Sequence, residues 1–193
     1  NEDIWDYNSA QILILMLCDI VSKGGNLLLD IGPDGNGKIP PVMQERLLQI
    51  GEWLKINGEA IYGTRKWKNP VQWSEGKFMT IEEYKKAHNL HYLGGDYILK
   101  QTVNPDQGLA VKQMFFTRKG NNVYAILPKI PDKPLKIKDM PVSASTKVSM
   151  LGVNKPMKWK KSGDDIVVTV PVLTVNDVTW QHAFVLKITD VLQ

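Results

Sequence analysis

The chain begins with a polar segment and then places apolar residues at helical spacing. These positions recur every three or four residues, which predicts a helix over residues 9–23. They are Ile12, Leu13, Met16, Leu17, Ile20 and Val21. Ser9 is suited to cap the start of this helix, and Gly24 with Gly25 to end it. A second apolar stripe predicts another helix that starts at Pro40 or Pro41 and closes at Asn57-Gly58.

Between the two helices lies the nearly continuous apolar run NLLLDI, residues 26–31. Runs of this kind are typical of a strand buried on both faces, as in a parallel sheet. The first 60 residues therefore read as helix, strand, glycine-rich loop and helix, an α/β repeat unit. A lone parallel strand needs neighbours, and no similar unit follows it. We therefore expect this to be the last unit of a parallel-stranded domain whose earlier repeats precede Asn1.

The pattern changes after about residue 65. Residues 64–78, with Pro70 and Gly76, read as a connector, and residues 80–90 as a short helix in which Thr80 and Glu83 form a capping box. Short, often alternating strands follow, separated by turn residues, which suggests an antiparallel sandwich. The predicted strands are residues 96–103, 111–119, 122–130, 135–140, 146–152, 157–161, 165–173 and 183–192.

Composition narrows the function classes. The net charge of +4 comes from 24 basic and 20 acidic residues that are spread along the chain, so a nucleic-acid partner is not expected. No apolar run reaches the length of a membrane span, and neither a signal peptide nor a membrane partner is expected. The single cysteine, Cys18, excludes an internal disulfide and reads as a small buried apolar residue.

The loop GPDGNGKIPP, residues 32–41, allows several interpretations. A phosphate cradle is disfavoured because Lys38 is followed by Ile39 and two prolines, which lack the N–H groups that a phosphate needs. A calcium loop is disfavoured because Lys38 stands where a third oxygen ligand belongs. Two alternatives remain: a tight turn held by Asp34 and Asn36, or a loop at the active-site face of an α/β barrel.

The stretch GGNLLLDIGPDGNGKIPPVMQERLLQIGEWLKINGEAIYGTR closely resembles the end of the catalytic barrel in α-L-fucosidases of glycoside hydrolase family 29. The later STKVSMLG, followed by KW, is similar to the C-terminal β-sandwich of that family. The resemblance implies an α/β plus all-β fold: the last βα unit of a (β/α)8-like barrel over residues 1–65, a connector over 66–96, and an antiparallel β-sandwich over 97–193. Residues 77–112 are less familiar and read as an insertion.

The resemblance also implies a retaining exo-glycosidase that removes terminal α-L-fucose from glycans without a cofactor or a metal. An aspartate attacks the anomeric carbon and a second carboxyl group acts as acid and then base. In this family both groups lie on earlier barrel strands, so we expect no catalytic residue in this chain. The expected partners are a fucosylated glycan, the preceding barrel portion and a second copy of the chain. The family implies a periplasmic, extracellular or lysosomal location.

Four residues are candidate substrate contacts. Trp5, in IWDYN, matches the family's WGY segment, where an aromatic side chain packs on the sugar, although Asp6 replaces the usual glycine. Tyr7 is a weaker candidate, for which packing is the more ordinary role. Asp30 stands where the family usually has asparagine, and Asp34 follows in the glycine-rich loop. An ordinary packing or turn-forming role is the alternative for each of the four.

Other residue pairs and clusters have simpler interpretations. His88 and His91 could share a helix face as metal ligands, but no third ligand is near in sequence. The pairs Glu82-Glu83 and Asp164-Asp165 read as surface charges, and His182 as structural. Four tryptophans could form a sugar-binding platform, the basis of an alternative function as a non-catalytic carbohydrate-binding or scaffolding module; packing between domains is the simpler interpretation. They are Trp67, Trp73, Trp159 and Trp180.

Overall fold

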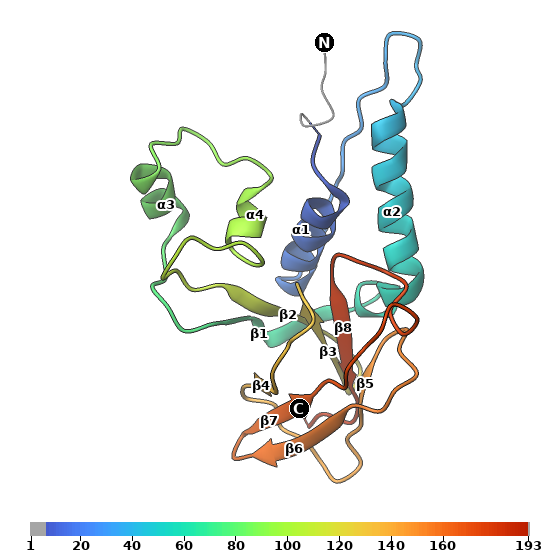
Figure 1. Ribbon diagram of the computed structural model, residues 1–193, viewed down its shortest axis with the longest axis vertical. Helices are drawn as coiled ribbons and strands as arrows, with labels where there is room; N and C mark the ends of the chain where they lie inside the picture. Colours follow the sequence, from blue (N-terminus) through green and yellow to red (C-terminus); the bar gives the residue numbers. More distant parts are fainter. Residues whose placement is uncertain (1–6, 193) are drawn as a thin grey trace.

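The computed structural model describes residues 7–192, which form helices at one end and two antiparallel sheets at the other (Figure 1). The helices are α1 (Ala10–Ser22), α2 (Pro41–Asn57), the 3-10 turn η2 (Gly58–Ala60), α3 (Ile81–Ala87) and α4 (Tyr97–Lys100). The strands are β1 (Arg65–Trp73), β2 (Lys112–Lys119), β3 (Asn122–Leu127), β4 (Leu135–Ile137), β5 (Val148–Met150), β6 (Lys158–Ser162), β7 (Asp165–Thr169) and β8 (Phe184–Ile188). No helix in this range is long and apolar enough to span a membrane.

The sheets are layered with the helices. The larger sheet has the order β1-β2-β3-β8-β5 and the smaller one β4-β7-β6, with every named pair antiparallel. One apolar core lies between the sheets and includes Phe116, Ile166 and Leu186. A second core lies on the other face of the larger sheet, where α1 packs its Leu15 against residues such as Phe115. Because side chains alternate along a strand, neighbours such as Phe115 and Phe116 enter different cores.

The predicted helices are confirmed, with their caps. Ser9 accepts a hydrogen bond from the backbone N–H of Ile12 at the start of α1. Helix α2 begins at Pro41, where the missing N–H of proline costs nothing. Thr80 and Glu83 form the predicted capping box of α3. Cys18 is fully buried, as predicted.

Residues 26–31 do not form the predicted strand within the described chain. These residues make no strand pairing, and the side chain of Leu28 is 95% exposed. A strand is stable only when neighbouring strands satisfy its backbone groups. Within residues 7–192 no parallel neighbour lies beside this run, so it stays extended and unpaired.

Two further assignments are wrong. Residues 64–78 are not only a connector, because β1 pairs with β2 and forms one edge of the larger sheet. A register shift between Lys66 and Val71 lets Pro70 sit in this strand, consistent with proline being confined to edges and bulges. Residues 96–103, predicted as a strand, contain the short helix α4, which packs Ile98 into the core beside α1. The later predicted strands are all present, most of them shorter than predicted; β6 keeps the predicted length and is shifted by one residue.

Candidate active-site edge

Some of the predicted site residues line a small cavity. It has a volume of about 230 Å³ and lies where the residues before α1, the unpaired run 26–31 and the start of α2 meet. Its lining residues are Tyr7, Asn8, Leu13, Leu29, Asp30, Ile31, Met43, Arg46 and Leu47. This volume lies below the usual range for ligand pockets, which suits one edge of a larger site better than a complete one.

The structure brings Tyr7 and Asp30 to this cavity, where they are candidate contacts from two separate segments. Trp5 lies outside the described residues. Of the described residues that line the cavity, Asp30 alone carries a carboxylate. Glycoside hydrolysis normally needs two carboxyl groups on opposite sides of the scissile bond. The described lining therefore does not contain both reacting groups.

Asp34 holds a turn and does not line this cavity. Its Oδ1 accepts hydrogen bonds from the backbone N–H groups of Asn36, at 2.8 Å, and Lys38, at 2.9 Å. The backbone N–H of Asp34 in turn donates to the carbonyl of Lys38, and Gly37 adopts a positive φ of 78° that suits glycine. The turn-forming role of Asp34 is confirmed, since Oδ1 of its carboxylate bonds the loop backbone.

Arg46 is the lining residue that sequence reasoning missed. Its Nη1 donates to Gln49 Oε1 at 3.3 Å and lies 3.6 Å from Glu45 Oε1. Its buried Nε has no hydrogen-bond partner among the described residues. Burial, followed by the nearby Arg46 charge, lowers the pKa of His182. Arg46 therefore adds a positively charged side chain to the cavity lining that also contains Asp30. The ERL stretch within the quoted motif was the available sequence clue.

The other candidate clusters take structural roles. His88 stacks on Tyr84, and its Nε2 lies 3.2 Å from Asp106 Oδ2. Across residues 7–192, no group of three or more potential metal ligands forms. Glu83 belongs to the α3 cap, and Asp165 accepts a hydrogen bond from the backbone of Asp139, consistent with the surface roles expected for both acidic pairs.

The tryptophans divide into two groups. Trp67 and Trp180 are buried, which confirms packing for both, while Trp73 and Trp159 are half-buried. The Nε1 groups of Trp53 and Trp180 both donate to the carbonyl oxygen of Ala183. This shared acceptor ties α2 to the segment before β8. Trp180 therefore serves packing between helix and sheet.

Comparison with known proteins decides the family. Residues 1–59 match the family model described as alpha-L-fucosidase, and residues 106–189 match the model described as alpha-L-fucosidase C-terminal domain. The chain belongs to the α-L-fucosidase family. Human tissue alpha-L-fucosidase is 33% identical over 188 residues, covering 96% of this chain and 33% of the relative. Alpha-L-fucosidase of Dictyostelium discoideum is 32% identical, covering 98% of the chain and 35% of the relative.

Solved structures agree with this family. The Thermotoga maritima alpha-fucosidase in complex with fucose matches with a TM-score of 0.67 and 31% identity, covering 98% of this chain and 36% of that one. The alpha-L-fucosidase isoenzyme 1 from Paenibacillus thiaminolyticus has the same fold, with a TM-score of 0.64 at 20% identity. The chain thus spans about a third of the length of the fucosidases that it matches.

Proposed function

We propose that this chain is the C-terminal part of a retaining exo-α-L-fucosidase that removes terminal α-L-fucose from glycans. The observation that carries the proposal is the order of the two family matches, a fucosidase segment followed by the fucosidase C-terminal domain. Similarity to a fucose-bound structure along nearly the whole chain supports it. No comparison favours the alternative of a non-catalytic module.

The unpaired run 26–31 supports a finer architectural proposal. Its apolar side chains include Leu28 and Leu29, which are exposed although the run has the composition of a buried strand. Parallel strands on either side would satisfy its backbone groups and cover these side chains. We infer that residues 7–60 form the last βα unit of a (β/α)8-like barrel, which packs on the antiparallel β-sandwich through α1.

In this proposal the cavity beside Tyr7 borders the sugar site. Loops after the strands of such barrels form the active-site face, and Asp30 lies at the end of the proposed strand. Asp30 and Arg46 would offer an acceptor and a donor to sugar hydroxyl groups, and the Tyr7 ring a flat apolar surface. Trp5, two residues earlier, would add a second aromatic face. The nucleophile and the acid/base group belong to the preceding barrel portion.

The first test is activity. The longest open reading frame that contains this chain is expressed and assayed with p-nitrophenyl α-L-fucoside, beside the 193-residue chain alone. We expect hydrolysis with retention of anomeric configuration from the longer protein and no hydrolysis from the chain alone, because a retaining mechanism needs its nucleophile. Hydrolysis of a different aryl glycoside, or inversion, would overturn the proposal.

The second test addresses the site in that longer protein. Asp30→Ala should lower kcat/KM about tenfold if Asp30 accepts a hydrogen bond from the sugar. Asp34→Ala, in the same loop, is the matched control, because its carboxylate bonds the backbone. It should lower the melting temperature and leave kcat/KM unchanged. Equal kinetic effects of both changes would remove Asp30 from the site.

A further inference from the structure

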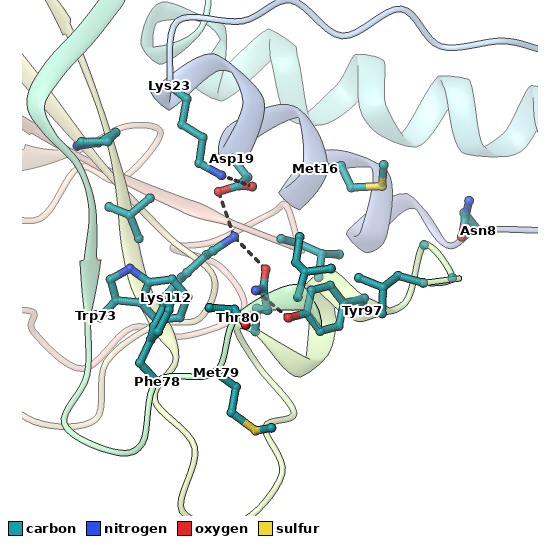
Figure 2. Close-up of a pocket in the computed structure, with 18 residues that line it drawn as sticks. Asn8, Met16, Asp19, Lys23, Trp73, Phe78, Met79, Thr80, Tyr97 and Lys112 are labelled. Carbon is teal, nitrogen blue, oxygen red and sulfur yellow. Dashed lines mark hydrogen bonds and ion pairs between the residues drawn. The ribbon is translucent and has the colours of Figure 1, made fainter. Parts of the chain in front are cut away.

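A second and larger cavity lies on the other side of α1. Its volume is about 770 Å³, and it is an open cavity bordered by α1, the end of β1, the segment around α3 and helix α4 (Figure 2). This size is within the range of small-molecule sites. The proposed fucosidase site does not use it, and much of its wall comes from residues 77–112, the insertion-like segment.

A bulge between β1 and β2 builds the floor of this cavity. Gln72 pairs with Met114 but Trp73 pairs with Lys112, so Gln113 is an extra residue in β2. Without the bulge, Lys112 would share a face with Met114, which lies in the core between the sheets. With it, Lys112 turns toward α1 and lies 5.7 Å from the centre of the Trp73 ring. Bulges commonly re-aim side chains beside functional sites.

A chain of hydrogen bonds crosses this floor, as Figure 2 shows. Lys112 Nζ donates to Asp19 Oδ1 at 3.0 Å and to Gln101 Oε1 at 2.7 Å. Gln101 Nε2 donates to the hydroxyl group of Tyr97 at 3.0 Å, and Lys23 donates to the other oxygen of Asp19 at 2.7 Å. Burial lowers the pKa of Lys112 despite the nearby Asp19 carboxylate. These polar groups are held in place by one another and need little reorganisation to meet a ligand.

The rim of the cavity is aromatic and partly exposed. Phe78 packs edge-on against Trp73, with ring centres 5.1 Å apart, yet its side chain remains 57% exposed. On the other side the backbone of Gly95 approaches the side-chain amide of Asn8 so closely that a Cβ atom at Gly95 would collide with it. The cavity thus combines flat apolar surfaces with fixed amide, carboxylate, hydroxyl and ammonium groups.

We propose that this cavity is an accessory sugar-binding site, which holds a neutral sugar of a glycan that the enzyme acts on. A pyranose ring has apolar C–H faces that pack on aromatic rings such as Phe78 and Trp73. Its hydroxyl groups both donate and accept, which suits Gln101, Asp19 and Tyr97. A simple anion would not use the aromatic wall, and a purely apolar ligand would not use the remaining donor and acceptor capacity of the floor groups. The choice of a sugar rests on the proposed function.

The test uses this chain and two probes, lactose and 2′-fucosyllactose. Nitrogen-15 labelling of the indole groups allows each sugar to be titrated to about 50 mM while the Trp73 signal, assigned by its loss in Trp73→Phe, is followed. We expect saturable shifts of this signal with millimolar affinity for at least one sugar. Absence of a shift, or a shift confined to other tryptophans, would overturn the proposal.

Two matched variants sharpen the result. Phe78→Ala removes an exposed ring at the rim, and Tyr62→Ala removes a ring of similar exposure, 60%, that does not line the cavity. Affinity should fall at least about fivefold in Phe78→Ala and stay unchanged in Tyr62→Ala. Equal affinity in Phe78→Ala and the wild type would contradict the proposal.

A hydrolysis assay distinguishes the proposed sugar-binding cavity from the proposed fucosidase activity. In the longer protein, Phe78→Ala should leave hydrolysis of p-nitrophenyl α-L-fucoside unchanged, because the small substrate does not reach the cavity. Sugar binding without any fucosidase activity would reject the enzyme proposal and keep the cavity proposal. Fucosidase activity without sugar binding would reject the cavity proposal alone.

Discussion

The two halves of the molecule bury their apolar residues to different degrees. In the sheet half, residues 112–192, the strands supply both sides of a core between the sheets, and residues such as Ile137 and Ile166 are fully buried. In the helical half, residues 7–60, α1 is covered by the larger sheet, but α2 buries only Trp53 and Asn57. Leu28 and Leu48 are largely exposed there.

This difference indicates which half depends on the other. Every strand of the sheet half pairs with another of these strands or with β1, so its backbone partners all lie within the described chain. The helical half has the apolar residues of a domain interior without enough partners to cover them. The folded structure of the helical half therefore depends on a few contacts with the sheets. Each of these contacts can be removed by a single substitution.

The largest effect is expected from Trp53→Ala. Trp53 is buried, and its Nε1 donates to the Ala183 carbonyl oxygen at 2.9 Å. Truncation should lower the free energy of unfolding by about 4 kcal/mol, measured by urea denaturation. Leu48→Ala, on the exposed side of the same helix, should change it by less than about 0.5 kcal/mol.

Hydrogen exchange then locates the loss from Trp53→Ala. If the helical half depends on the sheets, amides in α2 should lose protection while those in β3 and β8 keep it. A uniform loss of protection across both halves would show that they unfold as one cooperative unit. It would contradict the inference that the helical half depends on the sheet half.

The next effect is expected from Asp19→Ala, which cuts the tie between α1 and β2. It leaves the buried Lys112 ammonium without its carboxylate, at a cost of about 3 kcal/mol. The control is Lys23→Ala, which removes an ion pair of Asp19 at 2.7 Å whose lysine is half exposed, and should cost about 0.5 kcal/mol. Equal losses measured by thermal unfolding would show that the Lys112 tie adds nothing to stability.

The contrast between the halves also explains what the sequence could predict. Helical spacing and caps identified α1, α2 and α3, because those signals are local. Alternation and turn residues located the later strands. The apolar run 26–31 has the composition of a buried strand, but pairing depends on neighbours that composition does not contain. Helix α4 was missed because four residues, without a side-chain cap, are ordered by packing of Ile98.

The residues of the candidate site could also be predicted only in part from the sequence. The family resemblance made Tyr7 and Asp30 candidates, and both line one cavity; their contact with a sugar stays a prediction. Arg46 was missed because on a helical pattern it reads as an ordinary polar position. The floor of the larger cavity was not predictable, since it depends on the bulge that turns Lys112 toward Trp73.

A smaller effect, confined to the sheet half, is expected at Asp177. Its Oδ2 accepts from Lys155 Nζ and from the backbone and hydroxyl groups of Thr174, and these contacts lower its pKa to about 2. A depressed carboxyl pKa stabilises the fold above the unfolded value, near 4, and this contribution is lost as pH falls toward 2. The difference in unfolding free energy between the wild type and Asp177→Asn should therefore shrink over that range.

A pH-independent difference in the Asp177→Asn comparison would mean that the Asp177 charge does not contribute. Protection of the helical half should not change in this variant at neutral pH, since Asp177 bonds Lys155, between β5 and β6, and Thr174, between β7 and β8, both in the sheet half.

The smallest effect on folding stability is expected from the double change Leu28→Ser and Leu29→Ser. Both side chains are exposed, so the free energy of unfolding should change by no more than about 0.5 kcal/mol. Exposed apolar residues still drive association, and the wild-type chain should form dimers or larger species in sedimentation velocity at high concentration. The double variant should shift toward monomer, while Val172→Ser with Val175→Ser, a pair in the sheet half that is 88% and 86% exposed, should not. A monomeric wild type would mean that the uncovered face of the helical half does not need a partner, and the comparison between the halves would then concern burial alone.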